Sequence, residues 1–242
     1  MNLIIDVGNT RIKLAVFKDA ALEELVHATK DSVLNEINTL LVKYPSLTKA
    51  IVSSVGNVPE AALELLNERF DLVQLDSETR VPFQNTYSTP NTLGVDRIAL
   101  VSAAAVQFPK KNVLVIDAGS CITYDFLTEE NQYLGGAISP GVMMRYKALH
   151  TFTANLPLLT PTLPIKTIGD STEAAMQSGV LFGIALEIDG YIAFWREQFP
   201  DFTIILTGGD AHFLRDSLKS DIFANSNFMM EGLNFILENN KD

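Results

Sequence analysis

The same short pattern occurs twice in this chain, about half its length apart. An apolar run ending in Asp-x-Gly stands near the start, as Leu3-Ile4-Ile5-Asp6-Val7-Gly8, and returns as Val113-Leu114-Val115-Ile116-Asp117-Ala118-Gly119. A second apolar stretch follows each copy, at residues 12–17 and 122–127. Each copy therefore predicts two strands joined by a tight turn. A repeat at this separation is typical of a duplicated α/β domain.

The separation of the two copies also predicts how the chain is organised. A length of 242 residues accommodates two domains of roughly 100–130 residues each. We expect residues 1–112 and 113–242 to form two related α/β halves with an active cleft between them. Hydrophobic residues make up 47% of the chain, which is enough for a substantial core in each half.

Charge restricts the partners that the chain can bind. The formal net charge is −11, and the sequence contains no run of Lys or Arg, so a nucleic-acid partner is not expected. A nucleotide remains possible, because backbone N–H groups and a metal ion can hold its phosphates. No leader-like segment opens the sequence, and no apolar run reaches the ~20 residues that span a bilayer. We expect a cytoplasmic protein without membrane contact.

Cysteine and histidine offer little for a metal site. Cys121 is the only cysteine, and His27, His150 and His212 lie far apart without a ligand-like spacing. We expect no disulfide, no Cys- or His-based metal site, and surface positions for His150 and His212.

The first Asp-x-Gly turn carries groups that suit phosphoryl transfer. A carboxylate such as Asp6 at a strand end can hold Mg²⁺ directly or through water. Gly8 lets the backbone approach a phosphate, and Arg11 and Lys13 add cations. For one copy alone, an ordinary hairpin with Asp in its turn is the favoured interpretation.

The second copy and a third motif favour a nucleotide site. Two Asp-x-Gly turns facing each other would clamp the phosphates of a nucleotide from both sides. Thr207-Gly208-Gly209-Asp210 follows an apolar run, and its paired glycines would let the backbone lie flat against an adenine or a ribose. The Gly-rich segment 135–141 predicts a turn. Patterns over residues 142–151 and 172–195 predict helices.

Asp96 stands in a second kind of motif, Gly94-Val95-Asp96-Arg97. A carboxylate in this turn can orient an alcohol for in-line attack on a phosphate, and positioning matters more than basicity when the hydroxyl keeps its proton until late. The alternative is that Asp96 caps a helix beginning near Arg97, with Arg97 as its exposed partner. Both roles are compatible.

Five motifs, in this order, resemble the type III pantothenate kinases: Asp6-Val7-Gly8-Asn9-Thr10-Arg11-Ile12-Lys13, Gly94-Val95-Asp96-Arg97, Asp117-Ala118-Gly119-Ser120, Gly135-Gly136 to Pro140-Gly141, and Thr207-Gly208-Gly209-Asp210. The resemblance covers essentially the whole chain. It implies two duplicated ribonuclease-H-like domains of the actin-like ATPase type and a homodimer. The implied activity is ATP-dependent phosphorylation of pantothenate, the first step of coenzyme A biosynthesis, with Mg²⁺ and a monovalent cation, K⁺ or NH₄⁺.

The resemblance also implies roles for individual residues. Asp96 would accept the proton of the pantothenate hydroxyl, and Arg97 offers a bidentate partner for its carboxylate. Asp117 would hold the monovalent cation. Contacts to ATP would come from Asp6, Val7, Gly8, Asn9, Thr10, Arg11, Ile12, Lys13 and Ser120. Contacts to pantothenate would come from Tyr87, Gly94, Val95, Asp96, Arg97 and Thr172. Ser120 stands where the family usually has Thr, and it keeps the hydroxyl.

Two alternatives remain beside this interpretation. Kinases of the same fold act on sugars, glycerol or acetate, but the motif at residues 94–97 and the short chain argue against them. A nucleotide-binding regulator would keep the clamp without the transfer step, and relatives of the family have been described as accessory factors for transcription. The presence of Asp96 with its neighbours favours the enzyme. A helix face with Gly179 and Gly183 is the expected subunit contact.

Overall fold

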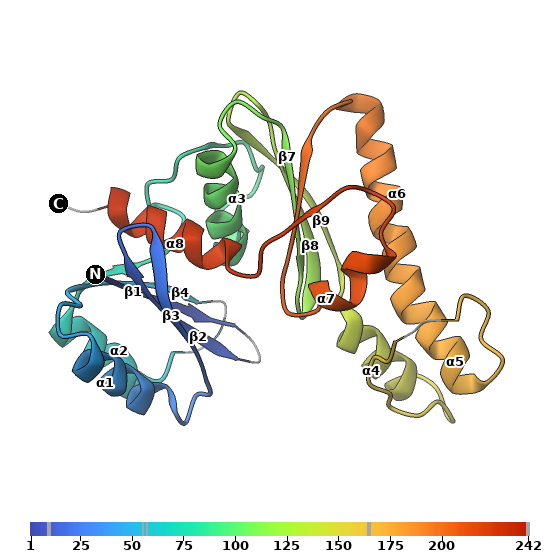
Figure 1. Cartoon of the computed structure of the whole chain (residues 1–242), viewed down its shortest axis with the longest axis horizontal. Helices are drawn as coiled ribbons and strands as arrows, with labels where there is room; N and C mark the ends of the chain where they lie inside the picture. The colour runs from blue at the N-terminus through green and yellow to red at the C-terminus, as the bar shows by residue number, and fades with distance from the viewer. Residues whose placement is uncertain (9–10, 55, 57, 164–165, 241–242) are drawn as a thin grey trace. The chain divides into compact units, whose positions relative to one another are not determined.

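The computed structural model describes residues 1–8, 11–54, 56, 58–163 and 166–240 (Figure 1). The chain divides into two compact units. Unit 1 comprises Met1–Pro109, Asn131–Tyr133 and Asn227–Asp242, and unit 2 comprises Lys110–Glu130 and Leu134–Ser226. Each unit contains its own sheet and its own helices.

The sheet of unit 1 is built around the first Asp-x-Gly strand. Its order is β3-β2-β1-β4-β5. β1 pairs antiparallel with β2 and parallel with β4, while β3 and β5 form the edges. The bounds are β1 Asn2–Val7, β2 Ile12–Lys18, β3 Ala21–Ala28, β4 Lys49–Ser54 and β5 Asp71–Gln74. The strands expected around both sides of the first turn are confirmed.

Helices cover both faces of this sheet (Figure 1). Residues 3, 5 and 7 of β1 share a hydrophobic core with α1 (Val33–Lys43) and α2 (Glu60–Arg69). The even-numbered residues point to the opposite face, where α3 (Val95–Gln107) and α8 (Phe228–Asn239) pack side by side. Asn2 on this face donates from Nδ2 to Oδ1 of Asn234 in α8 at 2.7 Å. Asp6 shares the face of Asn2, because the two residues are four apart on one strand.

The sheet of unit 2 has the same strand order around the second Asp-x-Gly strand. It runs β11-β10-β7-β8-β9. The two-residue strand β6 (Gln84–Asn85) of unit 1 pairs with Gln132 and Tyr133 at the start of β9, which also belong to unit 1. β7 pairs antiparallel with β8 and parallel with β10, as β1 does with β2 and β4. The bounds are β7 Val113–Ala118, β8 Cys121–Leu127, β9 Gln132–Pro140, β10 Thr203–Thr207 and β11 Phe223–Ala224. Two sheets with one strand order fit the duplicated fold that the sequence predicts.

The helices of unit 2 are α4 (Val142–Thr151), α5 (Thr172–Gln177), α6 (Gly183–Gln198) and the short α7 (Ala211–Leu214). A π-helical turn, Ser178–Phe182, joins α5 to α6. Buried residues of β7, β8, α4 and α6 form the core of the unit. Short 3₁₀ turns occur at Pro90–Thr92 in unit 1 and at Arg215–Ser217 in unit 2.

One detail differs from what the sequence predicts. Residues 135–140 belong to strand β9 rather than to a turn; Gly136 permits this, because a Cβ there would collide with the backbone carbonyl of Tyr124 on β8. The first segment of unit 1 ends at residue 109, and unit 2 begins at residue 110. Helix α8 packs with unit 1 although it lies at the end of the chain. Residues 1–112 and 113–242 as the duplicated halves remain a prediction.

Among the described residues, the helical run Thr172–Gln198 is long and apolar enough to cross a membrane by length and composition. Core helices of soluble proteins pass the same test. Val180, Ile184 and Ile188 of this run are buried in the hydrophobic core of unit 2, which accounts for its apolar character.

Candidate active site

Asp6 lies at the end of β1, between a cation and a hydroxyl on the neighbouring strands. Its register partners are Lys13 on β2 and Ser53 on β4. The Asp6 residue is only 7% exposed. Burial raises the pKa of this carboxyl to about 6; Lys13 acts in the opposite direction, and the charge of Asp96 raises the pKa further. The structure thus brings Asp6, Lys13 and Asp96, which the sequence analysis singled out separately, into one electrostatic neighbourhood within unit 1.

The turn after β1 is closed by a backbone hydrogen bond from the N–H of Gly8 to the carbonyl of Arg11 at 3.1 Å. Arg11 is exposed, whereas Val7 and Ile12 are fully buried in the core. Val7 and Ile12 can therefore reach a nucleotide only through their backbone. Two other residues expected to bind ATP, Asn9 and Thr10, lie outside the described residues.

Asp96 lies in the first turn of α3, one residue after the helix begins. Its Oδ1 accepts a hydrogen bond from the backbone N–H of Arg97 at 2.8 Å. Gly94 is the N-cap residue, so the expectation that Asp96 itself caps the helix is wrong by two positions. A Cβ at Gly94 would collide with Oδ1 of Asp96. Glycine is therefore required at this position if the carboxylate is to keep its place.

Arg97 is buried, at 4% exposure, and does not extend into solvent as the capping alternative supposed. Its guanidinium carbon lies 5.5 Å from the ring centroid of Tyr87, within range of a cation–π contact. Tyr87 in turn stacks on Tyr133, with centroids 6.0 Å apart. These contacts hold together three of the residues expected to bind the substrate, Tyr87, Asp96 and Arg97, with Gly94 beside them.

The second Asp-x-Gly hairpin places a different set of groups around its aspartate. Asp117 pairs with Thr123 on β8 and with Thr207 on β10. Thr123 is 9% exposed, and within the described part of the chain its Oγ1 is a buried oxygen without a hydrogen-bond partner. Ser120 is exposed at the turn, which the N–H of Gly119 closes by donating to the carbonyl of Cys121 at 2.9 Å.

Two Gly-containing motifs pack directly onto this hairpin. Gly208 has a φ of +97°, and a Cβ there would collide with Asp117 and with the carbonyl of Ala118. The N–H of Asp210 donates to the Ala118 carbonyl at 2.9 Å, and burial raises the pKa of the Asp210 carboxyl. At the start of α4, the N–H of Gly141 donates to the carbonyl of Ser120 at 3.2 Å. Motifs far apart in the sequence therefore meet at one turn of unit 2.

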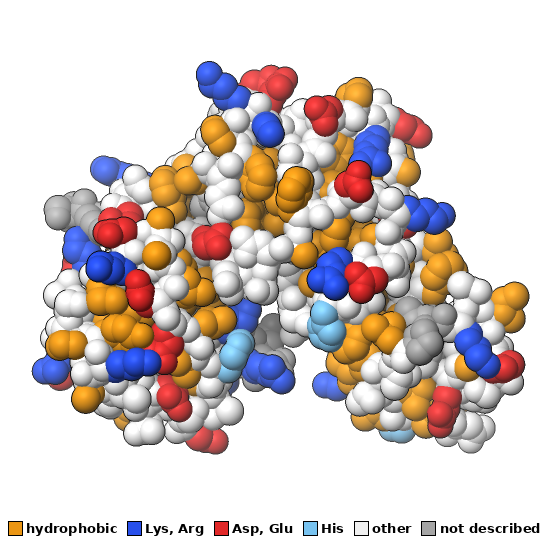
Figure 2. Space-filling view, in the orientation of Figure 1, with side chains coloured by type: hydrophobic (Ala, Val, Ile, Leu, Met, Phe, Trp, Pro, Cys, Tyr) orange, Lys and Arg blue, Asp and Glu red, His pale blue; other side chains and the backbone are white. Residues whose placement is uncertain are grey.

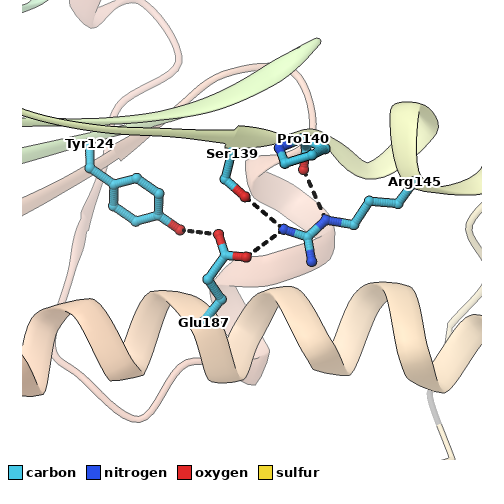
Figure 3. A network of polar contacts seen from close by, with 5 residues as sticks. All are labelled: Tyr124, Ser139, Pro140, Arg145 and Glu187. Carbon is cyan, nitrogen blue, oxygen red and sulfur yellow. Dashed lines mark hydrogen bonds and ion pairs between the residues drawn. The ribbon is translucent and has the colours of Figure 1, made fainter. Parts of the chain in front are cut away.

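A polar network supports the α4 side of this arrangement (Figure 3). Arg145 of α4 donates from Nε to the carbonyl of Pro140 at 2.9 Å, and from a terminal nitrogen to Ser139 Oγ at 2.9 Å and Glu187 Oε2 at 2.6 Å. Tyr124 donates to Glu187 Oε1 at 2.9 Å. Burial acts to raise the pKa of Glu187, but the hydrogen bonds from Arg145, Ser139 and Tyr124 prevail and lower it. The network ties the end of β9 to α6.

Sequence analysis did not identify Ser53, Thr123 or the packing role of Gly141. Each is a small polar or glycine residue at a strand end or helix start, where pairing partners cannot be known before the sheet order is known.

Thr172 is exposed at the start of α5, where Ser171 caps the helix by accepting from the N–H of Ala174. It belongs to unit 2, apart from the cluster around Asp96 in unit 1.

Histidine and cysteine contribute no metal site in the described residues, which contain no group of three or more His, Cys, Asp or Glu side chains suited to an ion. His150 and His212 are exposed. Mg²⁺ in kinases is commonly held by one or two carboxylates together with substrate phosphates. The Asp6 carboxylate fits this kind of ion, because it offers oxygen donors and leaves the remaining positions to a nucleotide.

Solved structures define the fold class. A Campylobacter jejuni protein described as a Baf family transcriptional activator matches with a TM-score of 0.66 at 23% identity, covering 98% of both chains. A Listeria monocytogenes protein described as an N-acetylmannosamine kinase matches with a TM-score of 0.55 at 13% identity, covering 100% of this chain and 99% of the other. The fold is the α/β fold of the sugar kinases and actin-like ATPases, as the sequence predicts.

Sequence relatives define the family. The model of the type III pantothenate kinase family matches residues 2–193. The type III pantothenate kinase of Christiangramia forsetii is 53% identical over 100% of this chain and 99% of its own, and that of Flavobacterium johnsoniae is 50% identical over 96% of both. The chain belongs to the type III pantothenate kinase family, whose members phosphorylate pantothenate in coenzyme A biosynthesis.

Proposed function

We propose that this chain transfers the γ-phosphoryl group of ATP to the primary hydroxyl of pantothenate, giving ADP and 4′-phosphopantothenate. The observation that carries the proposal is the cluster in unit 1, where Asp6, Lys13 and Asp96 share one electrostatic neighbourhood. Phosphoryl transfer depends on positioning and on charge stabilisation, and this cluster offers a carboxylate for each side of the reaction together with a cation.

In this proposal Asp96 orients the pantothenate hydroxyl and accepts its proton at a carboxylate oxygen. The N–H of Arg97 fixes Oδ1 of Asp96, which leaves Oδ2 for the substrate. Gly94 and Val95 line the same pocket. The Arg97 guanidinium is held beside Tyr87, where it offers a planar partner for the pantothenate carboxylate, and Thr172 adds a hydroxyl contact.

Asp6 serves the phosphates and their Mg²⁺, which when bound neutralises charge on the transferring group. Lys13 and Arg11 supply cations, while Val7, Gly8, Asn9, Thr10 and Ile12 contribute backbone or short polar contacts. Ser120 supplies a further contact to ATP. Gly209 has no described heavy atom within 4 Å of the place where a Cβ would stand, which suits a flat surface for adenine or ribose.

The proposed place of the adenine is a cavity of about 390 Å³ in unit 2, lined by Phe182, His212 and Phe213 among others. His212 and Phe213 follow the Thr207–Asp210 motif after one alanine, and their ring centroids lie 3.8 Å apart. Aromatic faces beside a Gly-Gly turn suit stacking on a purine.

A monovalent cation, K⁺ or NH₄⁺, is proposed at Asp117. Its register partners Thr123 and Thr207 offer hydroxyl oxygens, and the Thr123 oxygen is buried without a hydrogen-bond partner in the described part of the chain. Oxygen donors of this kind fit a hard cation. When bound, the cation would add positive charge near the phosphates.

We also propose a homodimer that forms through α6. Gly179, Gly183 and Gly190 have no described heavy atom beside the place of a missing Cβ, and Leu186 and Phe194 on this helix are 49% and 66% exposed. These side chains recur at helical spacing, so they share one face. Sedimentation of wild-type protein at micromolar concentration should show a dimer, and Phe194→Glu should show a monomer. A wild-type monomer would remove this part of the proposal.

The location and the excluded partners remain predictions. On the face drawn in Figure 2, acidic and basic side chains are interspersed, in keeping with the expectation of no nucleic-acid partner. Cytoplasmic location and absence of membrane contact rest on the sequence interpretation given above.

The proposed reaction can be tested with a panel of acceptors. Purified protein with Mg²⁺–ATP and K⁺ is incubated with pantothenate, glucose, glycerol or acetate, and the products are identified by mass spectrometry. A phosphorylated product from pantothenate alone is expected. Phosphorylation of a sugar, glycerol or acetate would assign a different acceptor. ATP binding without any phosphorylated product would favour the regulatory alternative.

A further inference from the structure

Ser53 is a buried serine next to Asp6. It lies near the end of β4 and pairs in register with Asp6 on the parallel strand β1. Side chains paired in this way project from the same face of a sheet. Ser53 is 0% exposed, and within the described part of the chain its Oγ has no hydrogen-bond partner. The hydroxyl therefore lies on the face that carries the Asp6 carboxylate, with its donor unused.

A buried hydroxyl without a partner carries a desolvation penalty that alanine at the same position would not carry. The neighbouring serine behaves differently, since the Ser54 hydroxyl donates to the backbone carbonyl of Gly56. In unit 2, Thr207 occupies the corresponding position beside Asp117. Both Asp-x-Gly aspartates thus have a hydroxyl residue on the parallel strand, which points to a role connected with the carboxylate.

We propose that Ser53 is a positioning residue for Asp6: when Mg²⁺–ATP is bound, the Ser53 hydroxyl donates a hydrogen bond to the Asp6 carboxylate and holds it in one orientation. The inference rests on the proposed function, in which Asp6 serves the phosphates and their metal ion. Hydrogen bonds with an ionised partner are the stronger kind.

Other charged groups act on the same carboxylate. Lys13 faces Asp6 from β2, and Asp96 acts on it from the start of α3, beside Arg97. His27 on β3 lies one strand further along the same row, opposite Lys13. On α8, Asn234 and Glu238 bond to Asn2, toward the other end of β1. A hydrogen-bond donor at Ser53 would hold the Asp6 carboxylate from β4, on the side of β1 opposite to Lys13.

The test compares three substitutions at Ser53. Ser53→Ala removes the donor, Ser53→Cys keeps a similar shape with a much weaker donor, and Ser53→Thr keeps the hydroxyl. Ser102→Ala is the matched control, because Ser102 is also fully buried but already donates to the carbonyl of Ile98 at 2.8 Å. All four variants are compared with wild type by thermal unfolding, kinetics and nucleotide affinity.

Ser53→Ala and Ser53→Cys should lower kcat/KM by about tenfold, the loss expected from one hydrogen bond to a charged group. Ser53→Thr should recover the wild-type kcat/KM at least in part, and Ser102→Ala should leave it unchanged. If Ser53→Thr does not fold, the Ala and Cys variants still test the inference.

A binding measurement separates this inference from the proposed reaction. Isothermal titration with Mg²⁺ and a non-hydrolysable ATP analogue should show weaker binding by Ser53→Ala, whereas the unliganded variant should be at least as stable as wild type. Unchanged kcat/KM and unchanged affinity in Ser53→Ala would overturn the inference. Absence of pantothenate phosphorylation by wild type would instead refute the proposed function, and the affinity comparison would still test Ser53.

Discussion

The two Asp-x-Gly hairpins share one topology but differ in what surrounds the aspartate. Asp6 is buried opposite Lys13 and near Asp96. Asp117 is half-buried, and its partners across both neighbouring strands are threonines. A carboxylate with a cation and a second carboxylate suits the reacting phosphates, whereas one surrounded by hydroxyl oxygens suits a cation of its own. Duplication of a fold therefore does not imply duplication of a site.

The turns differ as well. The N–H of Gly8 reaches the carbonyl of Arg11, three residues on, whereas that of Gly119 reaches Cys121, two residues on. The longer turn carries Arg11, while the shorter one is held by contacts from Gly141 and Gly208. The surroundings of the two aspartates therefore predict different roles for the two hairpins.

Substitution of Asp96 should give the largest effect if unit 1 carries the chemistry. We expect Asp96→Asn to lower kcat by about 10³-fold, within the range for loss of a general base, with nucleotide affinity nearly unchanged. Asp71→Asn, at an exposed aspartate of the same unit, should behave as wild type. Near-wild-type turnover by Asp96→Asn would remove the proposed role.

Asp6→Asn should separate stability from activity. We expect kcat/KM to fall by about 100-fold, and the unliganded protein to become more stable near pH 8. The folded-state pKa is raised from 3.8 to about 6, so the wild-type carboxyl favours folding below pH 3.8, and this contribution is lost as the pH rises through 6. This pKa shift corresponds to a change of about 3 kcal/mol at most in the free energy of unfolding.

Urea unfolding of wild type and Asp6→Asn at pH 4 and pH 8 measures this difference. The higher free energy of unfolding of the variant should appear at pH 8, and the difference from wild type should shrink toward pH 4. A variant that is less stable than wild type at pH 8 would mean that Asp6 is held by favourable contacts that outweigh its burial.

Asp117→Asn tests the other side of the comparison with a smaller effect. We expect the rate in K⁺ to fall about tenfold, the equivalent of roughly 1.4 kcal/mol in the barrier. The ratio of rates in K⁺ and in Na⁺ should approach one. Asp6→Asn should keep its K⁺ dependence despite its lower rate. Loss of the K⁺ dependence in both variants would contradict separate roles for the two hairpins.

Glu187→Gln tests the support beneath the second hairpin and should have the smallest kinetic effect. It weakens the ion pair with Arg145, so we expect a loss of about 1–2 kcal/mol in the free energy of unfolding near pH 7. Because the Glu187 pKa is lowered, the contribution of its charge is present above the unfolded-state pKa and is lost as the pH falls. The stability difference should therefore narrow in acid, while KM for ATP stays nearly constant.

The sequence predicted much of this architecture from local patterns. Alternating and apolar runs around Asp6 and Asp117 were sufficient to place β1, β2, β7 and β8, and helix spacing placed α3 and α4. The segment containing Gly135 and Gly136 was interpreted as a turn, because glycine in a strand that meets a neighbouring backbone has the same local signal as glycine in a turn. The packing of α8 within unit 1 depends on its contacts with α3. The sequence of α8 alone does not specify these contacts.

The candidate site was predictable where a motif is contiguous. Asp96 and Gly94 stand together in the sequence, and the structure explains the glycine by its contact with Asp96. Ser53 and Thr123 were not predictable, because their positions beside Asp6 and Asp117 follow from strand register. Only the capping alternative expected Arg97 to be exposed. Arg97 is buried and lies beside Tyr87, which is in a loop without regular pattern.

Release of ADP by purified wild-type protein with Mg²⁺–ATP tests the proposed activity most directly, with and without pantothenate, in K⁺ and again in Na⁺ alone. We predict turnover that requires pantothenate and is much faster in K⁺. Absence of pantothenate-dependent ADP release in either salt, from protein that still binds ATP, would contradict the assignment of this reaction to the chain.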